Sequence, residues 1–152
     1  MKTVIVYYST HHGNTRKVAE AIAQKHPDVS LIDVTKNKAA DLSKYDCVGF
    51  ASGVYGSKWG KPLLKFADFY LPKTKPVFFI TTSSMQREKF TEGIEDIVKA
   101  KRCKILGSFH CQGYDTFGPL KLIGGVGKGH PDAEDLEDAN KFFDSVLDEL
   151  ND

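Results

Sequence analysis

The chain has 152 residues, a formal net charge of +1, 41% hydrophobic residues and 27% charged residues. These proportions predict one globular domain over residues 1–152 and exclude a disordered chain. The apolar runs are too short to span a membrane, and we expect no leader sequence, because the N-terminus leads straight into the first predicted strand. The three cysteines form no CxxC pair, so we expect a cytoplasmic protein with reduced thiols. The near-neutral charge argues against a nucleic-acid partner.

Strand and helix patterns alternate along the chain. Apolar residues recur at spacings of three and four in four helical patterns, over residues 18–23, 63–71, 90–98 and 136–150. The predicted strands are residues 2–8, 29–34, 46–52, 76–82 and 103–112. The first, third and fourth strands are nearly continuous apolar runs, as expected of parallel strands covered on both faces. The alternation predicts an α/β fold with a doubly wound, five-stranded parallel sheet of order 2-1-3-4-5.

A loop rich in hydroxyl groups joins the first predicted strand to the first predicted helix. It comprises Ser9, Thr10, His11, His12, Gly13, Asn14 and Thr15. In a doubly wound sheet, ligands bind where the first and third strands end. The N–H groups and the positive dipole end of the following helix attract anions. The loop therefore predicts a phosphate site made of hydroxyls and backbone amides, with no lysine in the loop itself.

Two further loops are predicted at the same edge of the sheet. One contains Ser52, Gly53, Val54, Tyr55 and Gly56, and the other contains Thr81, Thr82, Ser83, Ser84 and Met85. Tyr55 offers a surface for an aromatic ring, and Gly56 allows a peptide to flip. A phosphate site, a ring surface and polar groups together describe the site of a nucleotide-like cofactor. No catalytic side chain is expected. No metal site is expected either, because adjacent histidines diverge and no third ligand has suitable spacing.

The region from residue 113 to 132 is unusually long and rich in glycine, as functional or mobile loops are. Its Gly-Lys pair at residues 127–128 superficially matches a Walker phosphate loop. However, Leu122 stands where that motif needs its first glycine, and Gly129 stands where it needs Ser or Thr. No GxGxxG follows the first strand, which weakens a dinucleotide-binding interpretation.

The loop sequence resembles that of the short-chain, FMN-binding flavodoxins. Their phosphate loop reads (Thr/Ser)-x-Thr-Gly-x-Thr, and this chain has Thr10-His11-His12-Gly13-Asn14-Thr15, with His12 in place of a threonine. The resemblance implies a flavodoxin-like fold with FMN as cofactor. It places Tyr55 at the stacking position and Gly56 at the peptide that reorients toward flavin N5. It makes residues 81–85 the other flavin loop, which here lacks an aromatic residue. On that side of the flavin, the stacking residue would be Met85, Tyr114 or Phe117.

The resemblance implies an electron carrier that cycles FMN among oxidised, semiquinone and hydroquinone forms, rather than an enzyme with its own substrate. One alternative is an FMN-dependent NAD(P)H or quinone reductase in which residues 113–132 form a lid. A second alternative is a flavin-free interaction module on the same fold. We expect a monomer whose partners are redox proteins.

Positive charge is predicted around the two ring loops. Residues 1–120 carry 18 Lys and Arg against 11 Asp and Glu, whereas residues 121–152 carry 3 against 9. The cations that flank the ring loops are Lys58, Lys61, Arg87 and Lys89, and Glu88 is the one nearby acid. This balance predicts a semiquinone/hydroquinone potential less negative than in acidic flavodoxins, and an acidic redox partner.

Overall fold

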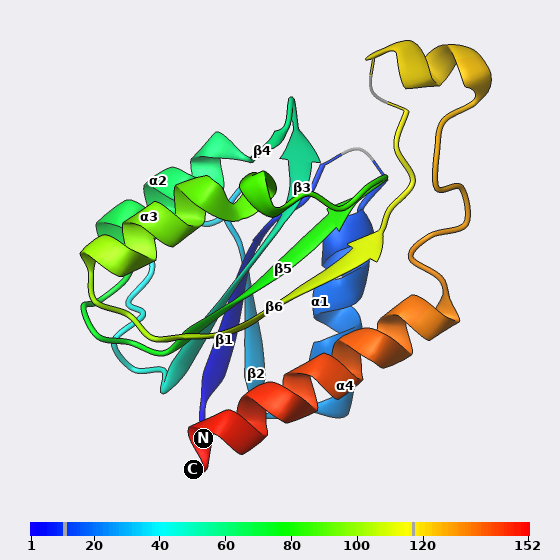
Figure 1. The fold of residues 1–152 in the computed structure, drawn as a ribbon. Coiled ribbons are helices and arrows are strands. Elements are labelled where there is room, and N and C mark those ends of the chain that lie inside the picture. Colours follow the sequence, from blue (N-terminus) through cyan, green and yellow to red (C-terminus); the bar gives the residue numbers. More distant parts are fainter. Residues whose placement is uncertain (11, 117) are drawn as a thin grey trace.

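A computed structural model describes residues 1–10, 12–116 and 118–152. Five parallel strands form the main sheet, in the order β2-β1-β3-β5-β6 (Figure 1). They are β1 (Thr3–Tyr8), β2 (Val29–Asp33), β3 (Cys47–Tyr55), β5 (Val77–Ser83) and β6 (Ile105–Gln112). The predicted fold class and the predicted order of these five strands are confirmed.

Helices cover both faces of the sheet (Figure 1). The four α-helices are α1 (Asn14–Lys25), α2 (Lys61–Tyr70), α3 (Glu92–Ala100) and α4 (Ala133–Leu150). Helices α2 and α3 lie on one face, and α1 and α4 lie on the other. Short 3-10 helices are η1 (Glu88–Thr91) and η2 (Gly118–Ile123). None of the helices in the described part of the chain has both the length and the apolar character needed to cross a bilayer.

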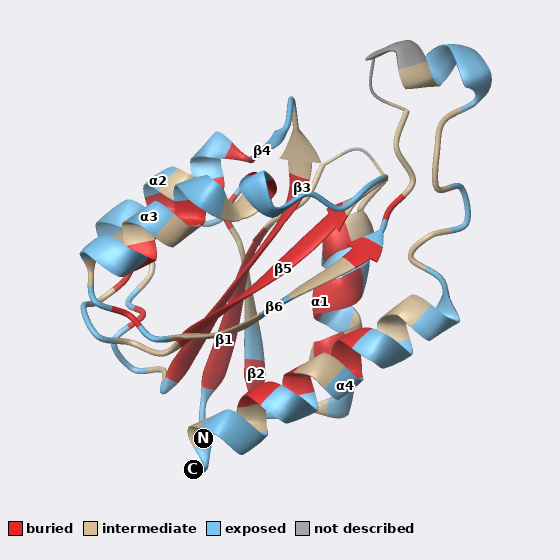
Figure 2. Ribbon diagram, in the orientation of Figure 1, coloured by how far each residue is buried: buried red, intermediate tan, exposed pale blue. Residues whose placement is uncertain are grey.

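Each face of the sheet has its own apolar core. Phe50 and Phe79 are buried beneath α2 and α3, whereas Phe78 and Phe143 are buried on the side of α1 and α4. Figure 2 shows the central strands buried along most of their length and the helices buried only where they face the sheet. Burial on both faces explains the continuous apolar runs of the central strands.

Two of the three cysteines are deeply buried in the second of these cores. Cys47 is fully buried and Cys111 is 5% exposed. Burial raises the pKa of each of these two thiols to about 12. Both groups are therefore neutral thiols at physiological pH.

The third strand is longer than predicted, and this changes the predicted ring loop. Residues 52–55 belong to β3, where Ser52 pairs with Thr81 and Gly53 pairs with Thr82. The chain then turns at Gly56 and Ser57, whose φ angles are 61° and 69°, into the antiparallel strand β4 (Lys58–Trp59). Two positive φ angles are typical of a tight hairpin turn. The loop prediction for residues 53–55 was wrong because their backbone pairs with neighbouring strands.

Between β6 and α4, residues 113–116 and 118–132 form a segment that we call the arm. The arm stands beyond the carboxyl edge of the sheet (Figure 1). Asp115 and Val126 exchange two backbone hydrogen bonds of 2.8 Å across the base of the arm. Helix η2 lies at its tip, where Leu122 is 89% exposed and Ile123 is 72% exposed. The arm then returns to α4. It is thus fixed at its base, next to the strand ends.

Candidate functional site

A cavity of about 320 Å³ lies at the carboxyl edge of the sheet. Its size falls within the range of about 300–1,000 Å³ that is usual for small-molecule sites. Its walls come from the loop between β1 and α1, the ends of β3 and β5, and the base of the arm. The lining residues are Ser9, Thr10, His12, Asn14, Thr15, Gly53, Val54, Tyr55, Thr82, Ser83, Gly113, Tyr114, Asp115, Thr116 and Lys121.

The loop between β1 and α1 presents hydroxyls and a helix N-terminus to the cavity. Gly13 is the N-cap residue of α1, in a left-handed conformation with φ of 69°, and as a glycine it offers no side-chain hydrogen bond to the helix. The first turn of α1, which the structure describes in full, has no acidic residue. The Ser9 hydroxyl accepts a hydrogen bond from the Arg16 backbone N–H at 3.2 Å. The Thr15 and Thr82 hydroxyls lie 2.8 Å apart. The wall is therefore polar, and the positive end of the helix dipole points toward it.

Tyr55 lies across the cavity toward the same loop. Its hydroxyl accepts hydrogen bonds from the Thr10 backbone N–H at 3.2 Å and from the Thr10 hydroxyl at 3.0 Å. The Tyr55 ring meets the Tyr8 ring edge-on, with centroids 5.3 Å apart. Burial raises the pKa of Tyr55, so its hydroxyl stays protonated at neutral pH. A donor that a ligand phosphate would need, the Thr10 N–H, is thus engaged by Tyr55.

The base of the arm closes the other side of the cavity. The His12 ring lies 3.1 Å, Nε2 to Oγ1, from the Thr116 hydroxyl and packs against the Tyr114 ring at 4.3 Å. Asn14 donates through Nδ2 to the Tyr114 carbonyl at 2.9 Å. A Cβ on Gly113 would lie 2.6 Å from Asn14 Nδ2, so only glycine fits there. The loop between β1 and α1 is therefore in direct contact with the arm.

Ten of the residues predicted from the sequence line this cavity. They are Ser9, Thr10, His12, Asn14, Thr15, Gly53, Val54, Tyr55, Thr82 and Ser83. Gly13 and Gly56 instead set the path of the backbone, both at positive φ. His11, and the candidate stacking residue Phe117, lie outside the described residues.

The remaining predicted residues lie beneath or beside the cavity. The Ser52 hydroxyl donates to the Gly53 carbonyl at 2.7 Å and accepts from the Gly60 N–H at 3.1 Å. The Thr81 hydroxyl accepts a hydrogen bond from the indole N–H of Trp59 at 3.0 Å. Both hydroxyls are used in holding the β3–β4 hairpin, and Trp59 is a core residue with 2% exposure. Ser84 donates to Asp115 at 3.3 Å.

Four lining residues were not predicted as ligand-binding residues, namely Gly113, Asp115, Thr116 and Lys121. A fifth, Tyr114, was predicted only as one of three alternatives for stacking on the ring. The glycine-rich sequence around these residues was the one signal for them, and it led to the prediction that residues 113–132 could form a lid. Tyr114 was considered as a stacking residue; its ring packs on His12, and its hydroxyl donates to the Gly124 carbonyl at 3.0 Å.

Comparison with known proteins identifies the family. A family model described as the flavodoxin domain matches residues 5–113. The chain belongs to the flavodoxin domain family. An uncharacterized protein of Methanocaldococcus jannaschii is 36% identical to this flavodoxin-domain protein over 149 residues, which is 97% of this chain and 99% of the relative.

Solved structures agree with this assignment at the level of the fold. A flavodoxin from the domain Archaea has a TM-score of 0.72 and 18% identity, with 99% of both chains covered. A flavodoxin of Fusobacterium nucleatum bound to flavin mononucleotide has a TM-score of 0.67 and 14% identity, covering 98% of this chain and 99% of that one. The family model ends at residue 113, so most of the arm and all of α4 lie beyond the part of the flavodoxin domain that it matches.

Charges around the cavity of this flavodoxin domain differ from the sequence expectation. The four predicted cations, at positions 58, 61, 87 and 89, are exposed, and none of them is among the described residues that line the cavity. Arg87 donates through Nε to Met85 Sδ at 3.2 Å. One cation, Lys121, and one acid, Asp115, do line the cavity. The four predicted cations therefore do not line the cavity, and the one cation among the described lining residues, Lys121, comes from the arm.

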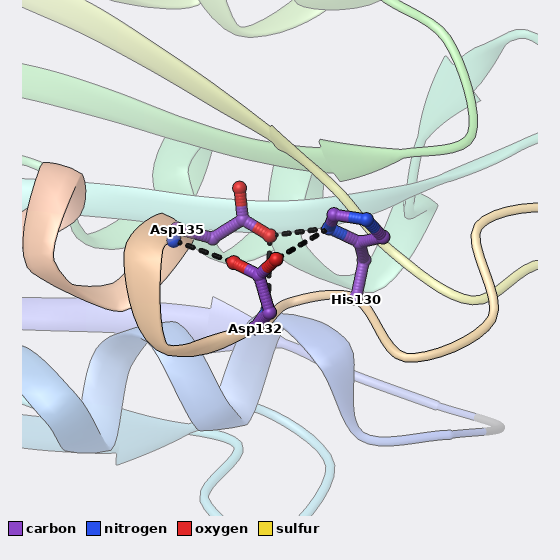
Figure 3. A group of neighbouring side chains, drawn as sticks. All are labelled: His130, Asp132 and Asp135. Atoms are coloured by element: carbon purple, nitrogen blue, oxygen red, sulfur yellow. Dashed lines mark hydrogen bonds and ion pairs between the residues drawn. The ribbon is translucent and has the colours of Figure 1, made fainter.

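A cluster of His130, Asp132 and Asp135 joins the arm to α4 (Figure 3). His130 Nδ1 donates to Asp135 at 2.6 Å. Asp135 also accepts the Asp132 N–H at 2.9 Å, and Asp132 accepts the Asp135 N–H at 2.9 Å. One oxygen of each carboxylate accepts a backbone N–H group, His130 Nδ1 is used by Asp135, and the positive end of a helix dipole lies beside them. We interpret the cluster as a helix cap extended by a histidine.

Proposed function

We propose that this protein binds FMN and carries electrons between redox proteins. The observation that carries the proposal is the cavity at the switch point of the sheet, where hydroxyls and the N-terminus of α1 face a ligand space of suitable size. Membership in the flavodoxin domain family supports it, as does the flavodoxin of similar fold that is bound to FMN. FMN supplies one-electron chemistry, while the protein supplies binding, orientation and electrostatics.

The donor set fits a phosphorylated ligand with a flat ring. The Thr10, Thr15 and α1 N-terminal groups would hold the phosphate, since they are neutral or positive donors at one wall. Lys121 would add a charge from the arm. Tyr55 and the ends of β3 and β5 would hold the ring, because they bring an aromatic surface and polar groups to the same cavity. No acid, base or nucleophile is required of the chain.

The test is ligand binding followed by reduction. We expect the protein to take up FMN with a flavin absorbance spectrum and to bind FMN at least about tenfold more tightly than riboflavin, because hydrogen bonds to a charged group contribute about 1.5–3 kcal/mol each. Thr10→Val should reduce this preference for FMN, and Thr10→Ser should retain it. Equal affinity for FMN and riboflavin would contradict the assigned phosphate site. A protein that takes up no FMN would instead favour the flavin-free interaction module.

A reductase is the second candidate, and the arm favours it. The arm brings Lys121 to the cavity and exposes Leu122 and Ile123 at its tip, as a segment closing over a substrate would. Turnover of the FMN-loaded protein with NAD(P)H and a quinone separates the two candidates. A carrier should turn over poorly, whereas a reductase should turn over many times per flavin.

A further inference from the structure

Another hollow, of about 500 Å³, lies between α2 and the segment that follows β2, from which Val34 and Lys38 line it. Aromatic side chains form much of its wall. Phe69 is 79% exposed. Its ring meets the Tyr70 ring edge-on at 4.8 Å, and the Tyr70 ring packs on Phe66 at 4.8 Å. This row of rings is held in place by the helix and presents a preformed apolar surface, which we call the α2 groove.

The charges around the α2 groove are all positive. Lys38, Lys61 and Lys65 line it, and no acidic residue is among the described residues that do. Within the described part of the chain, none of these lysines makes an ion pair within 4.0 Å. An exposed aromatic centre with a rim of one charge is complementary to a surface that carries carboxylates around an apolar side chain.

The α2 groove starts next to the cavity but does not overlap it. Lys61 follows Gly60, and Gly60 leaves no room for a Cβ because it lies against the Tyr8 ring. Tyr8 in turn contacts Tyr55, which lines the cavity. No described residue lines both the groove and the cavity. A protein bound at the groove would therefore lie beside the ligand space without filling it.

We propose that the α2 groove is the docking surface for an acidic protein partner, which inserts an apolar side chain beside Phe69 and pairs its carboxylates with the three lysines. That this partner is the electron donor or acceptor rests on the proposed function. The docking itself does not, since it uses no residue of the cavity.

The test is a titration of the ¹⁵N-labelled protein, with and without FMN, with a short peptide carrying Asp and Glu on both sides of a central Leu-Phe pair. Amide shifts should change along α2 and around Lys38 in both forms of the protein. Affinity should fall as salt rises. Lys61→Ser/Lys65→Ser should weaken binding about tenfold, because each exposed ion pair contributes about 0.2–1 kcal/mol. Phe69→Ser should weaken it by a similar factor.

Matched controls separate docking from general charge effects. Lys99→Ser/Lys104→Ser removes the same charge from exposed positions outside the groove and should leave the affinity within about twofold. A peptide with serines in place of Leu-Phe should bind more weakly. Shifts spread over the whole surface, or equal losses in both double variants, would overturn the proposal. So would concentration-dependent dimerisation that Phe69→Ser abolishes, because the groove would then hold a second copy. Failure to take up FMN would count against the proposed function alone.

Discussion

The hydroxyl of Tyr55 occupies hydrogen-bond donors on the wall of the cavity. It accepts hydrogen bonds from the backbone N–H and the hydroxyl of Thr10, which lies on the wall assigned to a phosphate. A ligand that uses the Thr10 N–H must first displace this hydroxyl. The form of the protein with Tyr55 on Thr10 therefore competes with ligand binding, and the measured affinity is lowered by the fraction of molecules in that form.

We expect Tyr55→Phe to bind FMN about twofold to tenfold more tightly than the unchanged protein, because the competing hydrogen bonds contribute about 0.5–1.5 kcal/mol. The phenylalanine keeps the ring for stacking. Isothermal titration or flavin fluorescence quenching measures the change. Tyr55→Ala is the matched control and should bind more weakly, since it loses the ring as well. Unchanged or weaker binding by Tyr55→Phe would show that the hydroxyl does not compete.

His12 illustrates what the sequence could and could not predict about single residues. Its position in a phosphate loop followed from the adjacent strand, glycine and helix signals. Its contacts with Thr116 and Tyr114 did not, because these partners lie more than 100 positions away along the chain. A local pattern specifies a turn and a helix start, but it carries no information about which distant segment packs there.

At the scale of elements, the junction between the arm and α4 depends on pH. The hydrogen bond to Asp135 raises the pKa of His130 above its ordinary value. Burial opposes ionisation of Asp135, but hydrogen bonds from His130 and from the Asp132 backbone outweigh it and lower the pKa of Asp135. The histidine's contribution to stability is present below its unfolded pKa of about 6.5 and is lost as pH rises through its folded pKa. The aspartate's contribution is present above about pH 3.9 and is lost as pH falls through its folded pKa.

We therefore expect the pairing to stabilise the junction most between about pH 4 and 6.5. The difference in unfolding free energy between the unchanged protein and His130→Gln should be largest near about pH 5 and shrink toward about pH 9. Denaturant unfolding at several pH values measures it. An NMR titration should give His130 a raised pKa that returns toward the ordinary value in Asp135→Asn. A His130 that titrates normally in the unchanged protein would contradict the assignment.

Helices and strands were predicted well where burial sets the pattern of apolar residues, and less well at the ends of each element. Continuous apolar runs identified the central strands because those strands are covered on both faces. Residues 53–55 were expected in a loop, yet they extend β3 because Gly53 pairs with Thr82 of β5 and Val54 pairs with Trp59 of β4. The pairing with β5 joins segments that meet only in the folded sheet, so composition alone does not reveal it, whereas the pairing with β4 is local and spans the turn at Gly56 and Ser57.

At the scale of the whole molecule, charge is unevenly divided. The excess of Lys and Arg lies in residues 1–120, and the excess of Asp and Glu lies in residues 121–152. Lys121 lines the cavity itself, and the exposed cations at 58, 61, 87 and 89 lie on the neighbouring loops and helices. Lys121 and Asp115 balance on the cavity wall itself, so the excess of positive charge lies farther out, where these four cations stand against Glu88.

If FMN binds there, we expect the potential of its second one-electron reduction to be less negative than in flavodoxins with acidic surroundings. Each cation near the site favours added negative charge by up to roughly 1 kcal/mol at screened distances. A dithionite titration against reference dyes measures the potential. Lys121→Gln should make it more negative, and Lys99→Ser should leave it unchanged. A potential in the unchanged protein as negative as in acidic flavodoxins would contradict this prediction.

The raised pKa values of Cys47 and Cys111 have a consequence for oxidation of the core. Peroxide attacks the thiolate form of cysteine, and it reacts far more slowly with a neutral thiol that solvent cannot reach. These two residues are both protonated and buried. The fold thereby keeps two easily oxidised side chains out of reach of peroxide.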